Sequence, residues 1–235
     1  MPECHSTNSL ASELAAQSIL SEGTVVITSN QTAGRGQRGK TWETSAGENL
    51  TFSILLKPAF LPIKSQFYLT IITSLAVIDF LTDQSVALAK IKWPNDILVG
   101  QKKICGILIE NSVLRDAIQQ SIVGIGLNIN QKVLGINTAT SLSIVATKDF
   151  DLNQMLNALL EKFEKRYLQL RSGRMTDLKK EYLENLFGLG SPRIFISDDK
   201  KFEGIIEDVD EAGELVLRVE NKRANYSLKE IAFVL

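Results

Sequence analysis

Two short apolar runs joined by a tight turn do most to limit how this chain can fold. Residues 97–99 and 103–110 are separated by Gly100-Gln101-Lys102, a spacing that is typical of a β-hairpin. Helical patterns stand before and after these hairpin-linked strands. The sequence therefore predicts an α+β fold, a mixed β-sheet backed by helices, and not a doubly wound parallel fold.

Periodicity and turn residues predict the other elements of this first region. Helices are expected at 7–20, 63–82, 152–170 and 175–187, and further strands at 24–28, 50–56, 86–92 and 118–129. The most apolar segment, Phe67 to Leu81, is interrupted by polar residues and is shorter than the roughly 20 residues of a bilayer span. We therefore expect it to form a buried helix.

The composition changes at Gly188-Leu189-Gly190-Ser191-Pro192. Five short strand patterns follow, at 193–197, 202–209, 214–219, 224–227 and 231–234, separated by Asp-, Asn- and Gly-containing turns. Regularly spaced short strands are typical of a small β-barrel. The predicted domains are thus 1–187 and 188–235.

The composition excludes several kinds of function. Twenty-six Lys and Arg nearly balance 27 Asp and Glu, so the chain lacks the bulk positive charge of a nucleic-acid-binding protein. Its two cysteines, Cys4 and Cys105, have no metal-ligand spacing, and its single histidine rules out a multi-histidine metal site. We expect a cytoplasmic protein with no resident metal, no nucleic-acid partner and no membrane partner.

The stretch from Gln31 to Trp42 carries the strongest chemical signal. Its three glycines allow backbone N–H groups to approach a ligand and to form an anion-binding concavity. Arg35, Arg38 and Lys40 add positive charge, and arginine makes bidentate contacts with phosphate. Trp42 offers a flat face to a purine. On residue types alone, a phosphate-binding loop and a basic surface turn both stay open.

Three further segments place polar or small residues at or inside apolar strands. Lys92-Trp93-Pro94-Asn95-Asp96 supplies a lysine for a phosphate, an amide for a metal-bound or ribose oxygen, and a carboxylate for an incoming amine. Lys103 begins a strand where it could neutralise a carboxylate, and Gly106 marks a bulge or a close approach. Gly124 to Asn130 leaves room beside a strand and contains Asn128, which needs partners if buried. Taken singly, a turn, a solvated lysine and a packing crossing are the commoner explanations.

Ser6-Thr7-Asn8 would by local rules be only a helix cap. In this order along the chain, however, these segments together resemble the biotin protein ligases. The resemblance covers about residues 5–130, and its most specific motifs are the Lys-Trp-Pro-Asn-Asp run and the Gly-Arg-Gly loop. It extends more loosely to the C-terminal region, where it implies an SH3-like β-barrel. Such ligases join biotin to ATP with release of pyrophosphate, then transfer biotin to a lysine of a carboxylase carrier domain with release of AMP.

The resemblance implies a role for each motif at the matching positions of this chain. Biotin would contact Ser6, Thr7, Asn8, Gln31, Gly34, Arg35, Gly36, Gln37, Lys103 and Gly106. ATP would contact Arg35, Arg38, Trp42, Lys92, Asn95 and Asn128. The catalytic residues would be Lys103 at the carboxylate, Arg35 at the phosphate, and Asp96 orienting the acceptor amine. Mg²⁺ would accompany the nucleotide, because the carboxylate must approach a second anion.

The chain departs from the family pattern at Gln37, where the loop commonly has a second arginine. That arginine helps to retain the adenylate, so the departure puts tight retention in question. Because the adenylate must be shielded from water, residues 34–47 are expected to be mobile without ligand and ordered with it. Some relatives carry an N-terminal DNA-binding domain, whereas the motifs here start at Ser6, and a monofunctional ligase is expected.

The expected partner is the biotin carboxyl carrier domain of a carboxylase, and a homodimer is left open. The nearest alternative is a lipoate or octanoate protein ligase on a related fold. A non-catalytic biotin-sensing module is a second alternative, which the intact lysines and arginine disfavour. An RNA-binding β-barrel is a third, which the charge balance and the few aromatic residues after position 188 disfavour.

Overall fold

A six-stranded sheet forms the centre of the protein in a computed structural model, which describes residues 1–17, 20–135, 138–220 and 222–234. The strand order is β2-β4-β8-β7-β6-β5. The bounds are β2 (Val25–Thr28), β4 (Leu50–Leu56), β5 (Ala89–Lys92), β6 (Asp96–Val99), β7 (Lys102–Leu114) and β8 (Ala117–Leu127). Each neighbouring pair is antiparallel, so the predicted mixed sheet is corrected, while the α+β class is confirmed. Parallel pairing occurs in a separate two-residue ladder of β1 (Glu3–Cys4) and β3 (Asn30–Gln31).

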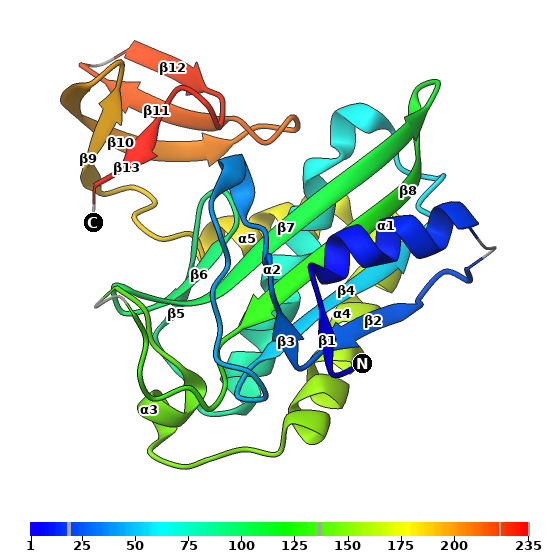
Figure 1. Ribbon diagram of the computed structural model, residues 1–235. Coiled ribbons are helices and arrows are strands. Elements are labelled where there is room, and N and C mark those ends of the chain that lie inside the picture. The colour runs from blue at the N-terminus through cyan, green and yellow to red at the C-terminus, as the bar shows by residue number, and fades with distance from the viewer. Residues whose placement is uncertain (18–19, 136–137, 221, 235) are drawn as a thin grey trace.

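Helices cover both faces of the sheet (Figure 1). Because side chains alternate along a strand, Leu50, Phe52 and Ile54 of β4 enter the main core, whereas Leu55 packs with Ala11 on the opposite face. That second face carries α1 (Thr7–Gln17). The main core lies under α2 (Phe67–Asp83), which packs against α4 (Leu152–Arg171) and α5 (Met175–Glu184). All seven residues of β4 are buried as a result.

Helix α2 is the apolar helix that the sequence predicted. With the short 3-10 turn η2 (Ile63–Ser65) before it, the segment Ile63–Asp83 is long and apolar enough, by length and composition alone, to cross a membrane. In the fold, however, 78% of its most apolar window is buried inside the protein. The segment therefore has the surroundings expected of a core helix, and the prediction that it is buried is confirmed.

The C-terminal region forms one five-stranded antiparallel sheet, in the order β12-β11-β10-β9-β13. Its strands are β9 (Pro192–Ser197), β10 (Lys200–Val209), β11 (Leu215–Val219), β12 (Lys222–Tyr226) and β13 (Ala232–Phe233). Figure 1 shows this sheet at one end of the larger sheet. Five strands were predicted here and five are present, but the pairings of the described residues do not close a barrel. The closed SH3-like barrel and the domain boundary at 187/188 therefore stay predictions.

The Trp-Pro corner and helix α2 hold the C-terminal sheet in place. Trp93 donates its indole N–H to the carbonyl of Gly213, in the turn between β10 and β11, at 2.9 Å. Gly213 has a φ of +91°, and a Cβ there would lie 2.4 Å from the ring of Phe67. Only glycine fits both constraints. Buried residues of both sheets, including Phe195 and Ile231, consequently belong to one hydrophobic cluster.

Several predicted bounds were wrong, and one helix was not predicted. Residues 86–88 precede β5 and contain a turn, in which the side chain of Leu88 is 71% exposed. The first helix ends at Gln17, and residues 18–19 of its predicted range lie outside the described residues. Helix α5 ends at Glu184, three residues early. The short helix α3 (Leu142–Ala146) begins at Ser141, whose hydroxyl caps it by accepting from the N–H of Ile144.

Candidate active site

One row of residues across the central sheet forms the floor of the candidate site. In cross-strand register, Lys92 pairs with Asp96, Asp96 with Gly106, Gly106 with Gly126, and Gly126 with Thr51. All five residues line one cavity of about 280 Å³. The two glycines leave the middle of the row without side chains, so the charged groups lie at one end of an open floor.

Polar groups from the start of the chain close one side of this cavity. The backbone N–H of Thr7 donates to Oε1 of Gln31 at 2.8 Å, which joins α1 to β3. The Asn8 side chain lies where Gly124 leaves space, since a Cβ at Gly124 would be 2.2 Å from Asn8 Oδ1. The buried hydroxyl of Ser53 donates to that same Oδ1 at 2.6 Å. Hydroxyl and amide groups are thus fixed in direction at this end, as recognition of a polar ring requires.

The Gly-Arg-Gly loop folds back on itself as a short flap, residues 34–42, over the cavity. The N–H of Trp42 donates to the carbonyl of Gly34 at 3.0 Å, and the N–H of Gly36 donates to the carbonyl of Lys40 at 2.7 Å. A Cβ at Gly34 would lie 2.2 Å from the carbonyl oxygen of Trp42, so this crossing requires glycine. A 3-10 turn, η1 (Gln37–Gly39), forms the tip.

The indole of Trp42 lies against the glycine floor. A Cβ at Gly126 would be 2.3 Å from Cε2 of Trp42, and a Cβ at Gly106 would be 3.0 Å from Cζ3. The two glycines therefore make a slot that fits a flat ring. The Trp42 Nε1 is buried and has no hydrogen-bond partner. A buried N–H without an acceptor is rare and can be satisfied by a ligand.

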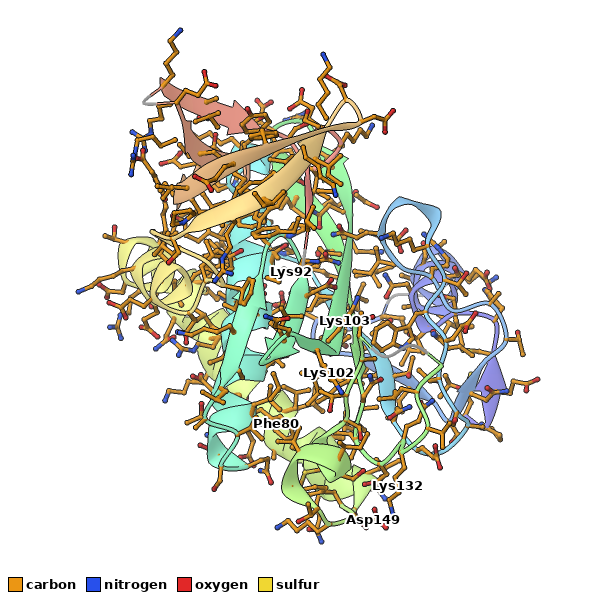
Figure 2. The ribbon with its side chains drawn as sticks, turned by 90° about the vertical axis from the view of Figure 1, so that its left-hand side faces the viewer. Phe80, Lys92, Lys102, Lys103, Lys132 and Asp149 are labelled. Carbon is orange, nitrogen blue, oxygen red and sulfur yellow. The ribbon has the colours of Figure 1, made fainter. Side chains whose placement is uncertain are left out.

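Three charged side chains meet beside this slot. Lys103 Nζ is 2.5 Å from Oδ1 of Asp96 and 5.3 Å from the centre of the Trp42 ring. Figure 2 shows Lys92 and Lys103 in the middle of the molecule, next to the C-terminal sheet. Burial is the main cause that lowers the pKa of Lys92 below 10.5; Lys103 and Lys40 lower it further, and Asp96 opposes the shift. An anionic ligand here would relieve the cost of holding these cations together.

The C-terminal sheet supplies an apolar wall that the sequence did not predict. Leu228, Ile231, Ala232 and Phe233 line the same cavity as the lysines. The amine of Lys92 lies 5.9 Å from the centre of the Phe233 ring. The ring itself packs against Phe195 at a centroid distance of 4.7 Å. The cavity therefore combines a polar end, a cationic middle and a wall of apolar side chains.

Most of the predicted site residues lie together. The cavity is lined by Ser6, Thr7, Asn8, Gln31, Arg35, Gly36, Gln37, Trp42, Lys92, Asn95, Asp96, Lys103 and Gly106. Gly34 instead lines an adjoining hollow between the flap, Leu108 of β7 and Leu228. Arg38 is in the flap's 3-10 turn, but its side chain lies outside what the structure describes.

Asn128 does not line the cavity. It is buried after the end of β8, and its side-chain amide donates to the carbonyl of Thr140 at 3.0 Å. Asn128 therefore joins the end of β8 to the segment before α3. A contact between Asn128 and the nucleotide stays a prediction.

Comparisons with known proteins now bear on this geometry. Residues 2–128 match the model of the biotin/lipoate A/B protein ligase family, which is more than half of the chain. The chain belongs to the biotin/lipoate A/B protein ligase family. The match ends directly after β8 and so covers the sheet, the flap and both lysines of this family member.

Individual members of the ligase family resemble the chain over most of its length. It is 33% identical to the bifunctional ligase/repressor BirA of Bacillus subtilis over 90% of its own length and 66% of that protein's, so it spans about two thirds of that relative. It is 31% identical to the biotin–[acetyl-CoA-carboxylase] ligase of Mycobacterium tuberculosis, covering 80% of that protein. The structure of the Aquifex aeolicus biotin protein ligase in complex with biotin and ATP superposes with a TM-score of 0.83 at 26% identity, covering 100% of this chain and 97% of that one.

Two parts of this ligase-family site escaped the sequence analysis. Glu110 contacts both Arg35 and Asn8, although the pattern identified it only as the end of an apolar strand. Its place on the same face as Gly106 follows from the period of two, which could have been a signal. The wall from the C-terminal sheet gave no such signal, because it depends on how two sheets pack.

Proposed function

We propose that this protein is an ATP-dependent biotin protein ligase. The observation that carries the proposal is the position of three charged side chains beneath the glycine-arginine flap. Lys92 and Asp96 belong to the cross-strand row, and the amine of Lys103 contacts Asp96. Hydroxyl and amide groups suited to a ureido ring stand at the other end of the same cavity. Relatives named as biotin ligases, and a superposable biotin ligase with biotin and ATP, support this choice within the family.

In the first step, a carboxylate oxygen of biotin attacks the α-phosphorus of ATP, and pyrophosphate leaves. Both reactants are anionic, so the step needs fixed positive charge between them. We assign Lys103 to the carboxylate and Arg35 to the phosphate. Lys92, whose lowered pKa reflects burial near other cations, would hold phosphate oxygens. The purine would stack against the ring of Trp42.

In the second step, the amine of a carrier-domain lysine attacks the activated carbonyl, and AMP leaves with the electrons of the broken anhydride bond. The Asp96 carboxylate lies 2.5 Å from Nζ of Lys103 and lines the cavity, so an incoming amine could contact it there. We assign Asp96 to orienting that amine. The carboxylase carrier domain is the proposed acceptor, as the names of the biotin–[acetyl-CoA-carboxylase] ligase relatives suggest.

Mg²⁺ is proposed to arrive with ATP. No cluster of three His, Cys, Asp or Glu side chains suited to a metal occurs within the described ranges. Asn95 and Asp96 line the cavity and offer the oxygen ligands that Mg²⁺ prefers. The phosphates and water would supply the remaining ligands. An SH3-like closure of the C-terminal sheet also stays a proposal, supported by its five short antiparallel strands.

The test measures exchange of labelled pyrophosphate into ATP with biotin, lipoate or octanoate as the carboxylic acid substrate, and then transfer of the acyl group to a carrier domain. Exchange with biotin, and biotin transfer, are expected. Exchange with lipoate or octanoate alone would assign the protein to the other branch of its family. Binding of biotin without exchange would instead identify a sensing module, and the catalytic assignment would be wrong.

A further inference from the structure

Glu110 joins two parts of the cavity wall that are far apart in the sequence. It lies on β7 two residues beyond Leu108 and four beyond Gly106, so all three face the side of the sheet that carries α1. Its Oε1 forms an ion pair with Nη2 of Arg35 in the flap. Its Oε2 accepts a hydrogen bond from Nδ2 of Asn8 at 2.9 Å. One carboxylate thus holds the flap and the N-terminal helix at once.

The contacts of Asn8 carry this link into the polar end of the cavity. Nδ2 of Asn8 also donates to the carbonyl of Leu108 at 3.2 Å, so both acceptors face the NH₂ group and fix the orientation of the amide. Oδ1 must then accept, and it accepts from the hydroxyl of Ser53 at 2.6 Å. Ser53 Oγ also lies 2.8 Å from Oγ1 of Thr7, whose hydroxyl donates to Oε1 of Gln31 at 3.2 Å. The contacts from Glu110 thus reach the cavity hydroxyls, and their direction is fixed as far as Ser53.

We propose that Glu110 is a positioning residue that holds Arg35 and the hydroxyls at the biotin end of the cavity in one fixed arrangement. Binding of a ligand at Thr7 would then order the flap. The inference rests on the proposed function for the identity of the ligand. Glu110 acts through Arg35 and Asn8, both of which line the cavity.

Burial differs between the two contacts, and this gives them different tasks. The side chains of Arg35 and Glu110 are 47% and 37% exposed, so their ion pair is screened by water and can open when the flap moves. Asn8 is buried, so its amide has no water to replace a lost carboxylate. The Asn8 contact therefore sets the site permanently, while the Arg35 contact holds the flap reversibly.

The variant Glu110→Gln tests this arrangement with little change in shape. Glutamine has a single acceptor oxygen, so either Arg35 or Asn8 must face an NH₂ group. Loss of one charge-assisted contact predicts a biotin Kd about tenfold higher by calorimetry. In steady-state assays, KM for biotin should rise, and kcat should fall as well, because the flap that carries Arg35 is no longer held by Glu110.

Trypsin reports on the flap, because Arg35, Arg38 and Lys40 are cleavage sites within it. Biotin should protect the wild-type flap from cutting, and this protection should be lost in Glu110→Gln even at saturating biotin. The matched control is Asp149→Asn. It breaks another exposed ion pair, with Lys132 at 3.0 Å, at the end of the molecule opposite the C-terminal sheet (Figure 2). This control should behave as wild type.

Unchanged biotin affinity together with unchanged flap protection in Glu110→Gln would overturn the proposal. A fall in kcat and melting temperature with no change in KM would also overturn it, because it would show a merely structural role. Should wild-type protein bind no biotin, the proposed function fails. The positioning role is then judged by flap cutting without ligand, which must be faster in Glu110→Gln than in wild type.

Discussion

Replacement of Lys103 by alanine is the most direct test of the chemistry assigned to the cavity. Lys103 Nζ lies 2.5 Å from Asp96 Oδ1 and faces the Trp42 ring at 5.3 Å, in a partly buried setting. Losing one group that stabilises developing charge in such a site typically costs about 10²–10³ in kcat. Lys103→Ala also leaves Asp96 without its cation beside an incoming carboxylate. We therefore expect a loss near the upper end, about 10³-fold in pyrophosphate exchange.

The assay is biotin-dependent exchange of pyrophosphate into ATP, with transfer to a carrier domain measured in parallel. Transfer by Lys103→Ala should fall below detection, whereas Lys103→Arg should retain part of the exchange. The control is Lys102→Ala, because Lys102 is adjacent in sequence but exposed. Near-normal turnover by Lys103→Ala, with the circular dichroism and melting temperature of the wild type, would refute the role given to this lysine.

The remaining predictions concern the floor and walls of the cavity. Lys92→Met should melt at a higher temperature than wild type at pH 7 and exchange pyrophosphate poorly. The pKa of Lys92 is lower in the folded chain than its ordinary value of 10.5, so between these two pKa values the unfolded chain binds more protons and the stability of the wild type rises with pH. The difference in melting temperature between Lys92→Met and wild type should therefore shrink as the pH approaches 10.5. A difference that stays constant over this range would contradict the argument. Gly124→Ala, whose Cβ would be 2.2 Å from Asn8 Oδ1, should raise the biotin Kd and leave ATP binding unchanged, as titration calorimetry can show. Phe233→Ala should instead raise KM for ATP and leave KM for biotin unchanged, because the Phe233 ring lies beside Lys92. A rise in KM for biotin alone would contradict this.

Local sequence patterns predicted the elements that depend on nearby residues. β4 was predicted with its observed bounds, Leu50–Leu56, because apolar residues alternate with Thr51 and Ser53 at strand spacing and Lys57-Pro58 closes the run. α4 was predicted to within one residue, since Asp151 caps it and its apolar positions repeat at helical spacing. The five-residue α3 was missed, because one serine cap before so short a run carries little periodicity.

The sequence predicted which residues form the site but not how they are arranged in space. The motifs named most of the residues that line the cavity, yet the cross-strand row depends on register, which a bulge between Ile97 and Leu98 shifts by one residue. The link from Arg35 to Glu110 spans 75 positions and joins a flap to a strand. No local pattern encodes such a contact.

The hydrogen bond from Trp93 to Gly213 has a consequence for any attempt to study the two regions apart. A chain cut after residue 187 would lose the acceptor of that indole N–H and the glycine turn that seats on Phe67. Ile231 and Phe195, part of the same continuous interior, would leave with it. The cut would thus expose apolar surface on both fragments and favour their aggregation. The place where composition changes along the chain is therefore a poor place to divide it.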